Sequence, residues 1–197
     1  MRLLVVSDTH ENVRAVDELL RIADMENVDA IIHCGDFISP IIIRRLLKFD
    51  KEIYGVWGNN DGDKDTIFHL IKNSKITIEN QPREIKIGDS KALIAHGWRS
   101  VEMTLRFIRL LALSGEYKYI FYGHTHNIEL SIVKNNKYKT LQKSFEKDSS
   151  YSLRLDEFDT LVLNPGEASG ILRGIPTYAI IDIYADKVVI RIEKMKI

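Results

Sequence analysis

Near its middle the chain reads Tyr119-Ile120-Phe121-Tyr122-Gly123-His124-Thr125-His126, an apolar run that ends in a glycine and two histidines. Four consecutive apolar residues followed by a glycine are typical of a buried strand that ends in a turn. In extended backbone, side chains two positions apart project from the same face, so both imidazoles are directed to one place. The segment therefore predicts a strand whose tip presents a pair of metal ligands.

Four other short apolar runs end in a similar way, with metal-binding side chains beside the last strand residue. Their tips read Asp8-Thr9-His10, Gly35-Asp36, Gly58-Asn59-Asn60-Asp61 and His96-Gly97. In open α/β sheets the carboxyl ends of the strands form the crevice in which ligands bind. If the five strands share one polarity, seven candidate ligands meet at that edge, namely Asp8, His10, Asp36, Asn59, His96, His124 and His126.

Donor chemistry indicates which ions such a site would hold. A mixture of nitrogen and oxygen ligands suits Mn, Fe, Co, Ni or Zn better than Ca or Mg, and we expect Mn first. Seven ligands are too many for one tetrahedral ion and suit two divalent ions that share a carboxylate, for which Asp36 is the natural bridge. Two-metal hydrolytic sites hold their ions about 3.5–4 Å apart, with a hydroxide between them as nucleophile. The resulting positive charge would attract an anion such as phosphate.

The order of the segments predicts an α/β fold. Apolar residues recur at helical spacing over 13–23, between the first two strands, which makes a right-handed β-α-β unit with parallel strands. A second helix over 41–48 leads to a third strand over 53–56. From residue 75 on, short alternating runs predict a largely antiparallel half with one long helix over 100–114. Two packed sheets with helices outside follow from this order.

Composition is ordinary for a soluble globular chain. The 197 residues are 45% hydrophobic and carry 28 basic and 28 acidic side chains, which fits one domain over residues 1–197. Zero net charge gives no general attraction to nucleic acid or to a membrane surface. We expect a cytoplasmic protein without a membrane segment, because no stretch can span a bilayer, the apolar start is too short for a signal peptide, and Cys34 has no disulfide partner.

The region around 134–158 is polar and lysine-rich, and it shows no strong periodicity. We interpret it as an exposed loop or hairpin extension. Substrate capture, an oligomer contact or a nucleic-acid-binding arm are the functional alternatives for its lysines.

The five tip motifs resemble, in order and spacing, those of the calcineurin-like metallophosphoesterases, and Asn164-Pro165-Gly166 with the final strands is similar to the small single-domain phosphodiesterases of that superfamily. The resemblance implies a four-layer α/β/β/α sandwich of two mostly mixed sheets. It implies one ion on Asp8, His10, Asp36 and His126 and a second on Asp36, Asn59, His96 and His124. The implied reaction is hydrolysis of a small phosphodiester by a metal-bridging hydroxide, and the resemblance admits a homodimer.

Two positions depart from the family pattern. Many relatives carry a histidine at the position of Asn60, which can donate a hydrogen bond to phosphate but cannot serve as a general acid. Glu167 stands where relatives often have serine, and we expect its carboxylate to lie in solvent. The predicted catalytic residues are Asn59, Asn60 and Asp61, and the predicted substrate contacts are Asn60, Trp98 and Arg99.

Several residues have a structural interpretation beside the functional one. Trp98 is as well explained by packing in the following helix, and we interpret His33, His69 and the buried Cys34 as structural. Two other functions stay open. The retromer subunit with a similar sequence pattern acts chiefly as a protein-interaction scaffold, which would require an exposed apolar patch, and a nuclease would require a nucleic-acid-binding surface.

Overall fold

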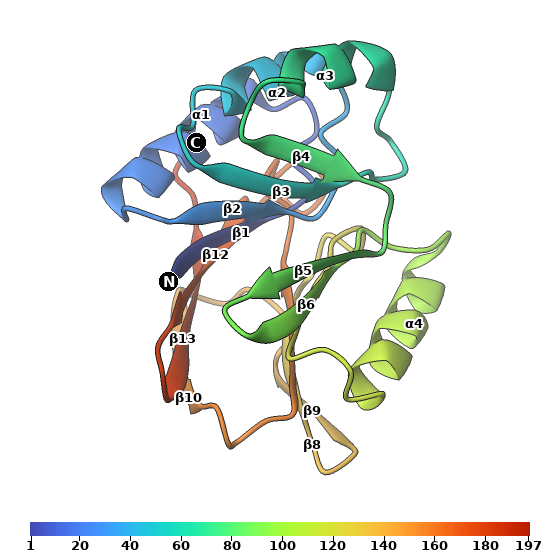
Figure 1. Cartoon of the computed structure of the whole chain (residues 1–197), viewed down its shortest axis with the longest axis vertical. Helices are drawn as coiled ribbons and strands as arrows, with labels where there is room; N and C mark the ends of the chain where they lie inside the picture. The colour runs from blue at the N-terminus through green and yellow to red at the C-terminus, as the bar shows by residue number, and fades with distance from the viewer.

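Two β-sheets pack face to face in the computed structural model, which describes residues 1–197, and helices cover both outer faces (Figure 1). The first sheet has seven strands in the order β10 (Ser149–Arg154), β13 (Lys187–Lys194), β12 (Thr177–Ile183), β1 (Arg2–Val6), β2 (Ala30–His33), β3 (Glu52–Val56) and β4 (Ile76–Glu79). The second has six in the order β5 (Arg83–Ile87), β6 (Ser90–Ile94), β7 (Tyr119–Phe121), β11 (Thr160–Pro165), β8 (Ile128–Lys134) and β9 (Lys137–Gln142).

The helices divide between the two outer faces. The helices are α1 (Val13–Met25), α2 (Pro40–Leu46), α3 (Lys64–Ile71) and α4 (Val101–Leu113). Figure 1 shows α1, α2 and α3 over the first sheet and α4 beside the second. The predicted four-layer α/β/β/α sandwich of two mixed sheets is confirmed. None of these helices has the length and apolar character needed to cross a membrane.

Strand β1 illustrates why the first sheet is buried on both faces. Leu4 and Val6 pack in the apolar cluster that contains the buried residues of α1 and α2, whereas Leu3 and Val5 pack in the cluster between the sheets. Strands β1 to β3 run parallel to one another, as the β-α-β order predicts. Strand β4, which we expected in the antiparallel half, also pairs parallel with β3. A parallel sheet covered on both sides requires continuous apolar strands instead of alternating ones, which explains the uninterrupted runs in the sequence.

The second sheet has a parallel centre as well. Strands β6, β7 and β11 are mutually parallel, and β5, β8 and β9 are antiparallel to their neighbours. Phe121 and Leu163 of this sheet complete the core between the sheets, while Ile108 and Ala112 of α4 cover its outer face. Five strands end at the edge where the two sheets meet, namely β1, β2, β3, β6 and β7. The loops that follow them can therefore form one site.

The region around 134–158 forms strands in both sheets. β8 turns into β9 through Asn135 and Asn136, which adopt the positive φ angles of 49° and 58° that a tight turn needs. The chain then crosses to the first sheet, where β10 pairs with β13. The predicted hairpin accounts for β9. The prediction omitted β10, whose Tyr151 and Leu153 pack against the core between the sheets and make this short polar segment a strand.

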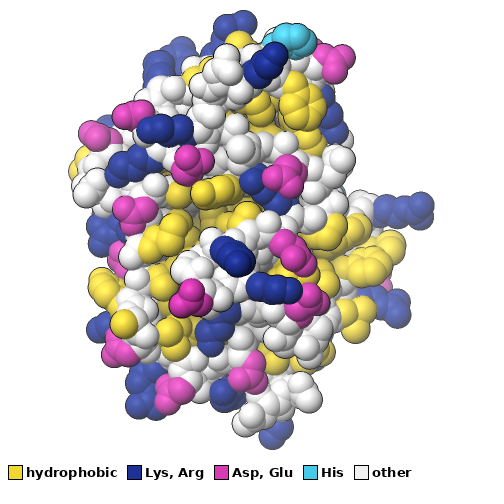
Figure 2. All heavy atoms as spheres, in the orientation of Figure 1, with side chains coloured by type: hydrophobic (Ala, Val, Ile, Leu, Met, Phe, Trp, Pro, Cys, Tyr) yellow, Lys and Arg dark blue, Asp and Glu magenta, His cyan; other side chains and the backbone are white.

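One helix face remains uncovered. Val101, Met103, Phe107 and Leu110 of α4 are between 38% and 57% exposed, and Figure 2 shows hydrophobic side chains gathered over this helix. Trp98 packs at the start of this face, with its ring 5.3 Å from that of Phe107. The contact with Phe107 therefore agrees with the interpretation of Trp98 as a residue that packs against the following helix.

His33 is a buried structural histidine at the end of β2. Its Nδ1 accepts a hydrogen bond from the amide of Gly35 at 3.2 Å, and its Nε2 lies 3.0 Å from the hydroxyl of Thr9. Because the acceptor nitrogen cannot carry a proton, the ring is neutral. Burial lowers the pKa of His33 from 6.5 to about 3.

This depressed pKa predicts a pH dependence of stability in metal-free protein. Below pH 6.5 the unfolded chain binds a proton at this position and the folded chain does not, so stability is lost as the pH falls, by about 1.4 kcal/mol per pH unit, down to about pH 3. In His33→Asn we expect this contribution to vanish. Urea unfolding of both proteins between pH 7 and pH 5, with chelator present, measures the difference in slope, and parallel profiles would contradict it.

Candidate active site

The loops after β1, β2, β3, β6 and β7 bring the seven predicted ligands together at one edge of the sandwich. Asp8 and His10 follow β1, Asp36 follows β2, and Asn59 follows β3. From the second sheet, His96 follows β6, and the two remaining histidines follow β7. Contacts of 2.8–3.5 Å link side chains from the different loops into two groups that share this edge.

The first group contains Asp8, His10 and His126, whose ligand atoms lie within 4.8 Å of one another. The Nε2 atom of His126 is 3.4 Å from Oδ1 of Asp8. Neither this Oδ1 nor the buried Nε2 of His10 has a hydrogen-bond partner. Donor atoms that share an ion at about 2.1 Å lie roughly 3–3.4 Å apart, so a cation at this place would satisfy all three groups.

The second group contains Asp36, Asn59, His96 and His124. Oδ1 of Asn59 lies 2.9 Å from Nε2 of His96 and 2.8 Å from Nδ1 of His124. Nδ1 of His96 lies 2.8 Å from the carbonyl of Cys34, which can only accept, so this nitrogen carries the proton. In the neutral ring Nε2 then presents a lone pair to the Asn59 oxygen. These two acceptors, Nε2 of His96 and Oδ1 of Asn59, face each other, and a cation between them would stabilise both.

Two buried carboxylates connect the groups. Asp8 and Asp36 are at most 1% exposed, and their oxygens lie with a nitrogen of His96 within 4.8 Å. Burial raises the pKa of Asp8, because removing a carboxylate from water disfavours its charged form. Burial, together with the charge of His96, lowers the pKa of His124, which favours the neutral imidazole that metals bind.

The backbone of the site is strained at the ligands themselves. Five of the seven occupy the left-handed region, with φ between 44° and 66°, namely Asp8, His10, Asp36, His124 and His126. This region is uncommon for residues other than glycine and concentrates at functional sites, where the surrounding structure holds it in place. The turns direct these side chains inward directly after each strand ends.

Glycines let the loops approach the ligands closely. A Cβ on Gly58 would overlap Oδ1 of Asp36 and lie 2.5 Å from its backbone nitrogen, and one on Gly123 would overlap the hydroxyl of Ser7. A larger residue at Gly58 would displace Asp36, and one at Gly123 would displace Ser7, which is bonded to Asp8. These two glycines are therefore required by the close approach of the loops.

The Glu167 carboxylate is buried, which corrects the expectation that it lies in solvent. The residue is 1% exposed, and Oε2 accepts a hydrogen bond of 2.6 Å from Nδ1 of His126. The turn at Gly166, with φ 84°, directs the side chain inward. Burial opposes ionisation, but the bonds from His126 and from the amides of Arg173 and Leu172 outweigh it and lower the pKa of Glu167.

The hydrogen bond between Glu167 and His126 also changes the pKa of the histidine. Burial by itself lowers the pKa of His126, but the hydrogen bond to Glu167 and the charges of Asp8, Glu167 and Asp36 outweigh burial and raise it. Because the carboxylate accepts from Nδ1, this ring directs Nε2 toward Asp8.

The predicted catalytic residues Asn60 and Asp61 contact the ligand loops. Asn60 donates to Asp36 twice, from its backbone nitrogen at 2.9 Å and from Nδ2 at 2.8 Å. Asp61 accepts from the amides of Ile38, Gly58 and Asp36 at 2.6–3.3 Å, so its carboxylate holds the two loops together. Arg99 is exposed beside the His96 loop.

Sequence reasoning missed a further residue that holds the His96 loop. Oε1 of Gln81 accepts from the amides of His96 and Gly97, and its Nε2 donates to the carbonyl of Gly97. Gln81 lies between two strands, in no motif, and nothing in the local sequence distinguishes it from a surface glutamine. The structural interpretation of His69 fits its place on α3, where Nδ1 contacts only the carbonyl of Asp65.

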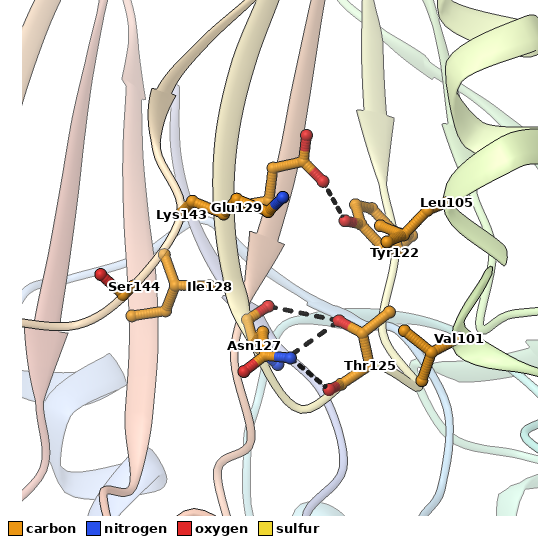
Figure 3. A pocket seen from close by; sticks show the side chains of 9 residues that line it. All are labelled: Val101, Leu105, Tyr122, Thr125, Asn127, Ile128, Glu129, Lys143 and Ser144. Carbon is orange, nitrogen blue, oxygen red and sulfur yellow. Dashed lines mark hydrogen bonds between the residues drawn. The ribbon is translucent and has the colours of Figure 1, made fainter.

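Two cavities lie beside the His124–His126 turn. The larger, about 380 Å³, has none of the ligands on its wall, and Figure 3 shows Glu129 bonded to Tyr122 on one side and Thr125 bonded to Asn127 on the other. The smaller, about 200 Å³, is lined by His126 together with Phe145 and Arg173. The second cavity therefore adjoins the cluster of ligands.

Fold and site together define a phosphoesterase. The family model for the calcineurin-like phosphoesterase superfamily domain matches residues 1–186, and the chain belongs to this family. The family implies hydrolysis of phosphate esters with divalent metal ions, for which the buried donor groups described above are the candidate ligands.

Individual relatives agree with this membership. Phosphodiesterase MJ0936 of Methanocaldococcus jannaschii is 31% identical over 185 residues, which cover 92% of this chain and 93% of that protein. A solved structure of a novel archaeal phosphodiesterase superposes with a TM-score of 0.77 at 29% identity, over 99% of this chain and all of the other. Vacuolar protein sorting 29 from Cryptosporidium parvum shares the fold, with a TM-score of 0.63 at 19% identity over 99% of this chain and 91% of that one.

The steric role of Gly58 gives a paired prediction. Gly58→Ala forces a Cβ against Asp36, and we expect it to lower the free energy of unfolding by about 1–3 kcal/mol and to weaken metal binding. In Gly62→Ala the nearest atom to the new Cβ is 3.6 Å away, so we expect a change within about 0.5 kcal/mol. Urea unfolding and metal titration of both variants test the pair, and equal behaviour would show that close approach at Gly58 is unimportant.

Proposed function

We propose that this chain is a phosphodiesterase that uses two divalent metal ions. The observation that carries the proposal is a pair of buried acceptors without a donor, Oδ1 of Asp8 and Nε2 of His10, with Nε2 of His126 3.4 Å from that oxygen. Burying an unpaired carboxylate is costly by several kcal/mol, and a cation removes that penalty. The relatives named phosphodiesterase support the substrate class.

Each ion has a proposed ligand set. Asp8, His10 and His126 would hold one, Asn59, His96 and His124 would hold the other, and Asp36 would contact both. When bound, two such ions supply Lewis acidity for a phosphate and a water acidic enough to act as nucleophile. The chain contributes imidazoles in fixed orientation, because the carbonyl of Cys34 and the carboxylate of Glu167 accept hydrogen bonds from Nδ1 of His96 and of His126.

The departing alcohol receives little help from Asn60. Its amide is engaged with Asp36 and has no proton to transfer to a leaving group. Asn60 would orient the carboxylate between the ions and present its amide edge to a bound phosphate. We therefore propose that hydrolysis is fastest for diesters whose leaving groups are already acidic.

The scaffold alternative is favoured by a specific observation, the exposed apolar face of α4 formed by Val101, Met103, Phe107 and Leu110. Such a face suits contact with another protein. It lies on a helix that contributes no ligand, so it is compatible with hydrolysis. We place the catalytic function first because every ligand position is filled.

The central test is metal-dependent hydrolysis of bis(p-nitrophenyl) phosphate. Metal-stripped protein reloaded with Mn, Ni or Zn should turn over the diester faster than p-nitrophenyl phosphate. His96→Ala and Asp36→Ala should lower kcat/KM by at least about 100-fold, as removal of a group stabilising the transition state does. His69→Ala, which removes a histidine from outside the site, should match the parent. Two bound metals per chain without any turnover would move the function to the scaffold alternative.

The leaving-group proposal has its own test. Across a series of phosphodiesters, log kcat/KM should fall steeply as the leaving-group pKa rises. Asn60→His places a general acid at this position, and we expect at least about a tenfold gain on alkyl esters with little gain on nitrophenyl esters, since general acid catalysis contributes about 10²–10⁴-fold. Asn60→Ala is the control for loss of the Asp36 contact. Equal rates for alkyl and nitrophenyl esters in the parent would refute the proposal.

A further inference from the structure

Glu167 has no place in the ligand sets above, yet it is buried as completely as the ligands. Its side chain is 0% exposed, and it lies against His126, whose side chain is 12% exposed. A carboxylate is rarely buried without partners that compensate its charge. The partners of Glu167 therefore show what the carboxylate does.

All strong partners of Glu167 donate hydrogen bonds. Oε2 accepts from Nδ1 of His126 at 2.6 Å and from the amide of Leu172 at 3.2 Å, and Oε1 accepts from the amide of Arg173. The hydroxyl of Ser169 lies 3.5 Å from Oε2. The histidine is therefore the side chain that the carboxylate contacts most closely, and its other close partners are backbone amides.

The segment around Glu167 is fixed to the strand that carries another ligand. The amides of Ala168 and Ser169 donate to the carbonyls of Ser7 and Asp8 at 2.9 and 3.1 Å. The backbone that carries Glu167 is therefore hydrogen-bonded to the backbone of Ser7 and Asp8, while its carboxylate contacts His126 after β7. The relative position of Asp8 and His126 depends on this connection between loops.

We propose that Glu167 is a positioning residue, which fixes the imidazole of His126 with its proton on Nδ1 and its Nε2 lone pair toward Asp8 and His10. It acts through the histidine and touches no substrate. The same carboxylate shapes the wall of the smaller cavity, because its bonds to Leu172 and Arg173 fold the loop that places Arg173 beside His126. The inference rests on the proposed metal-binding role of His126.

Imidazole nitrogen spectroscopy tests the proposal in the parent protein. In metal-free protein, ¹⁵N-resolved spectra of the histidine rings should show His126 protonated on Nδ1. A proton on Nε2 alone would overturn the assignment. This measurement needs no variant to fold and no activity to be present.

Metal titration of variants tests the consequence. Calorimetry with Mn²⁺ on metal-stripped Glu167→Ala should show one of two sites weakened by about 10–100-fold, the usual effect of removing a carboxylate behind a metal-binding histidine, with the other changed by less than about threefold. Glu167→Gln retains an oxygen that can accept from Nδ1, and it should recover much of the affinity. An Ala variant that loses stability but binds Mn²⁺ like the parent would contradict the proposal.

Two control variants separate positioning from general effects. Glu129→Gln alters another buried carboxylate, which is bonded to Tyr122, Tyr138 and Ser131 and not to a ligand, and Mn²⁺ binding should be unchanged. Asn12→Ser keeps the helix cap but removes the amide that donates to the carbonyl of Ser169, so it loosens the same loop without touching the Glu167–His126 pair. If the parent binds Mn²⁺ but hydrolyses no diester, the proposed function fails, while the ring spectra and the titrations still decide the role of Glu167.

Discussion

The arrangement of this protein depends on the buried carboxylate of Asp8. One of its oxygens accepts from the hydroxyl of Ser7 and the amide of His124, and the other has no donor at all. In a low-dielectric interior such an oxygen is stabilised only by a proton or a cation. The ligand atoms of His10 and His126 lie with this carboxylate within 4.8 Å of one another, so one cation placed among them would stabilise all three groups. The site is therefore built for positive charge, and the phosphoesterase chemistry of the family follows from that requirement.

A site of this kind needs a rigid support, and the two sheets supply it. Strand β1 pairs on both sides, with β2 and with β12, and its side chains are buried on both faces. The loops after such strands can hold ligands at positive φ because the strands on either side are fixed. Glycines at 58 and 123 then allow neighbouring loops to approach within contact of the ligands. The regular strands thus hold the ligand residues in backbone conformations that would otherwise be unfavourable.

The fold by itself leaves function open. Vacuolar protein sorting 29 from Cryptosporidium parvum shares it at 19% identity, which is evidence for architecture alone. What distinguishes an enzyme on this scaffold is the set of filled ligand positions and the groups behind them. In this chain those groups include a peptide carbonyl, a glutamine and a glutamate from three different loops. The apolar face of α4 lies on a separate element, so a protein contact there would not compete with the site.

Much of this was available from the sequence alone. Local patterns are sufficient for apolar strands, helical spacing and the polar tips that follow each strand, because these depend on neighbours within a few residues. They predicted the layers, a parallel half followed by a largely antiparallel half, and the meeting of seven side chains. They did not predict β10, because its short alternating pattern forms a strand only when it pairs with β13. They also did not predict the contacts of Gln81. Glu167 is the clearest case, since a carboxylate after a turn is usually solvated, and the donors that surround this one include His126, which is 41 residues away along the chain. Local patterns were thus enough to show which groups reach the edge of the sheets. The orientation of each group became visible only in the folded chain, because it depends on hydrogen-bond partners that are distant along the sequence.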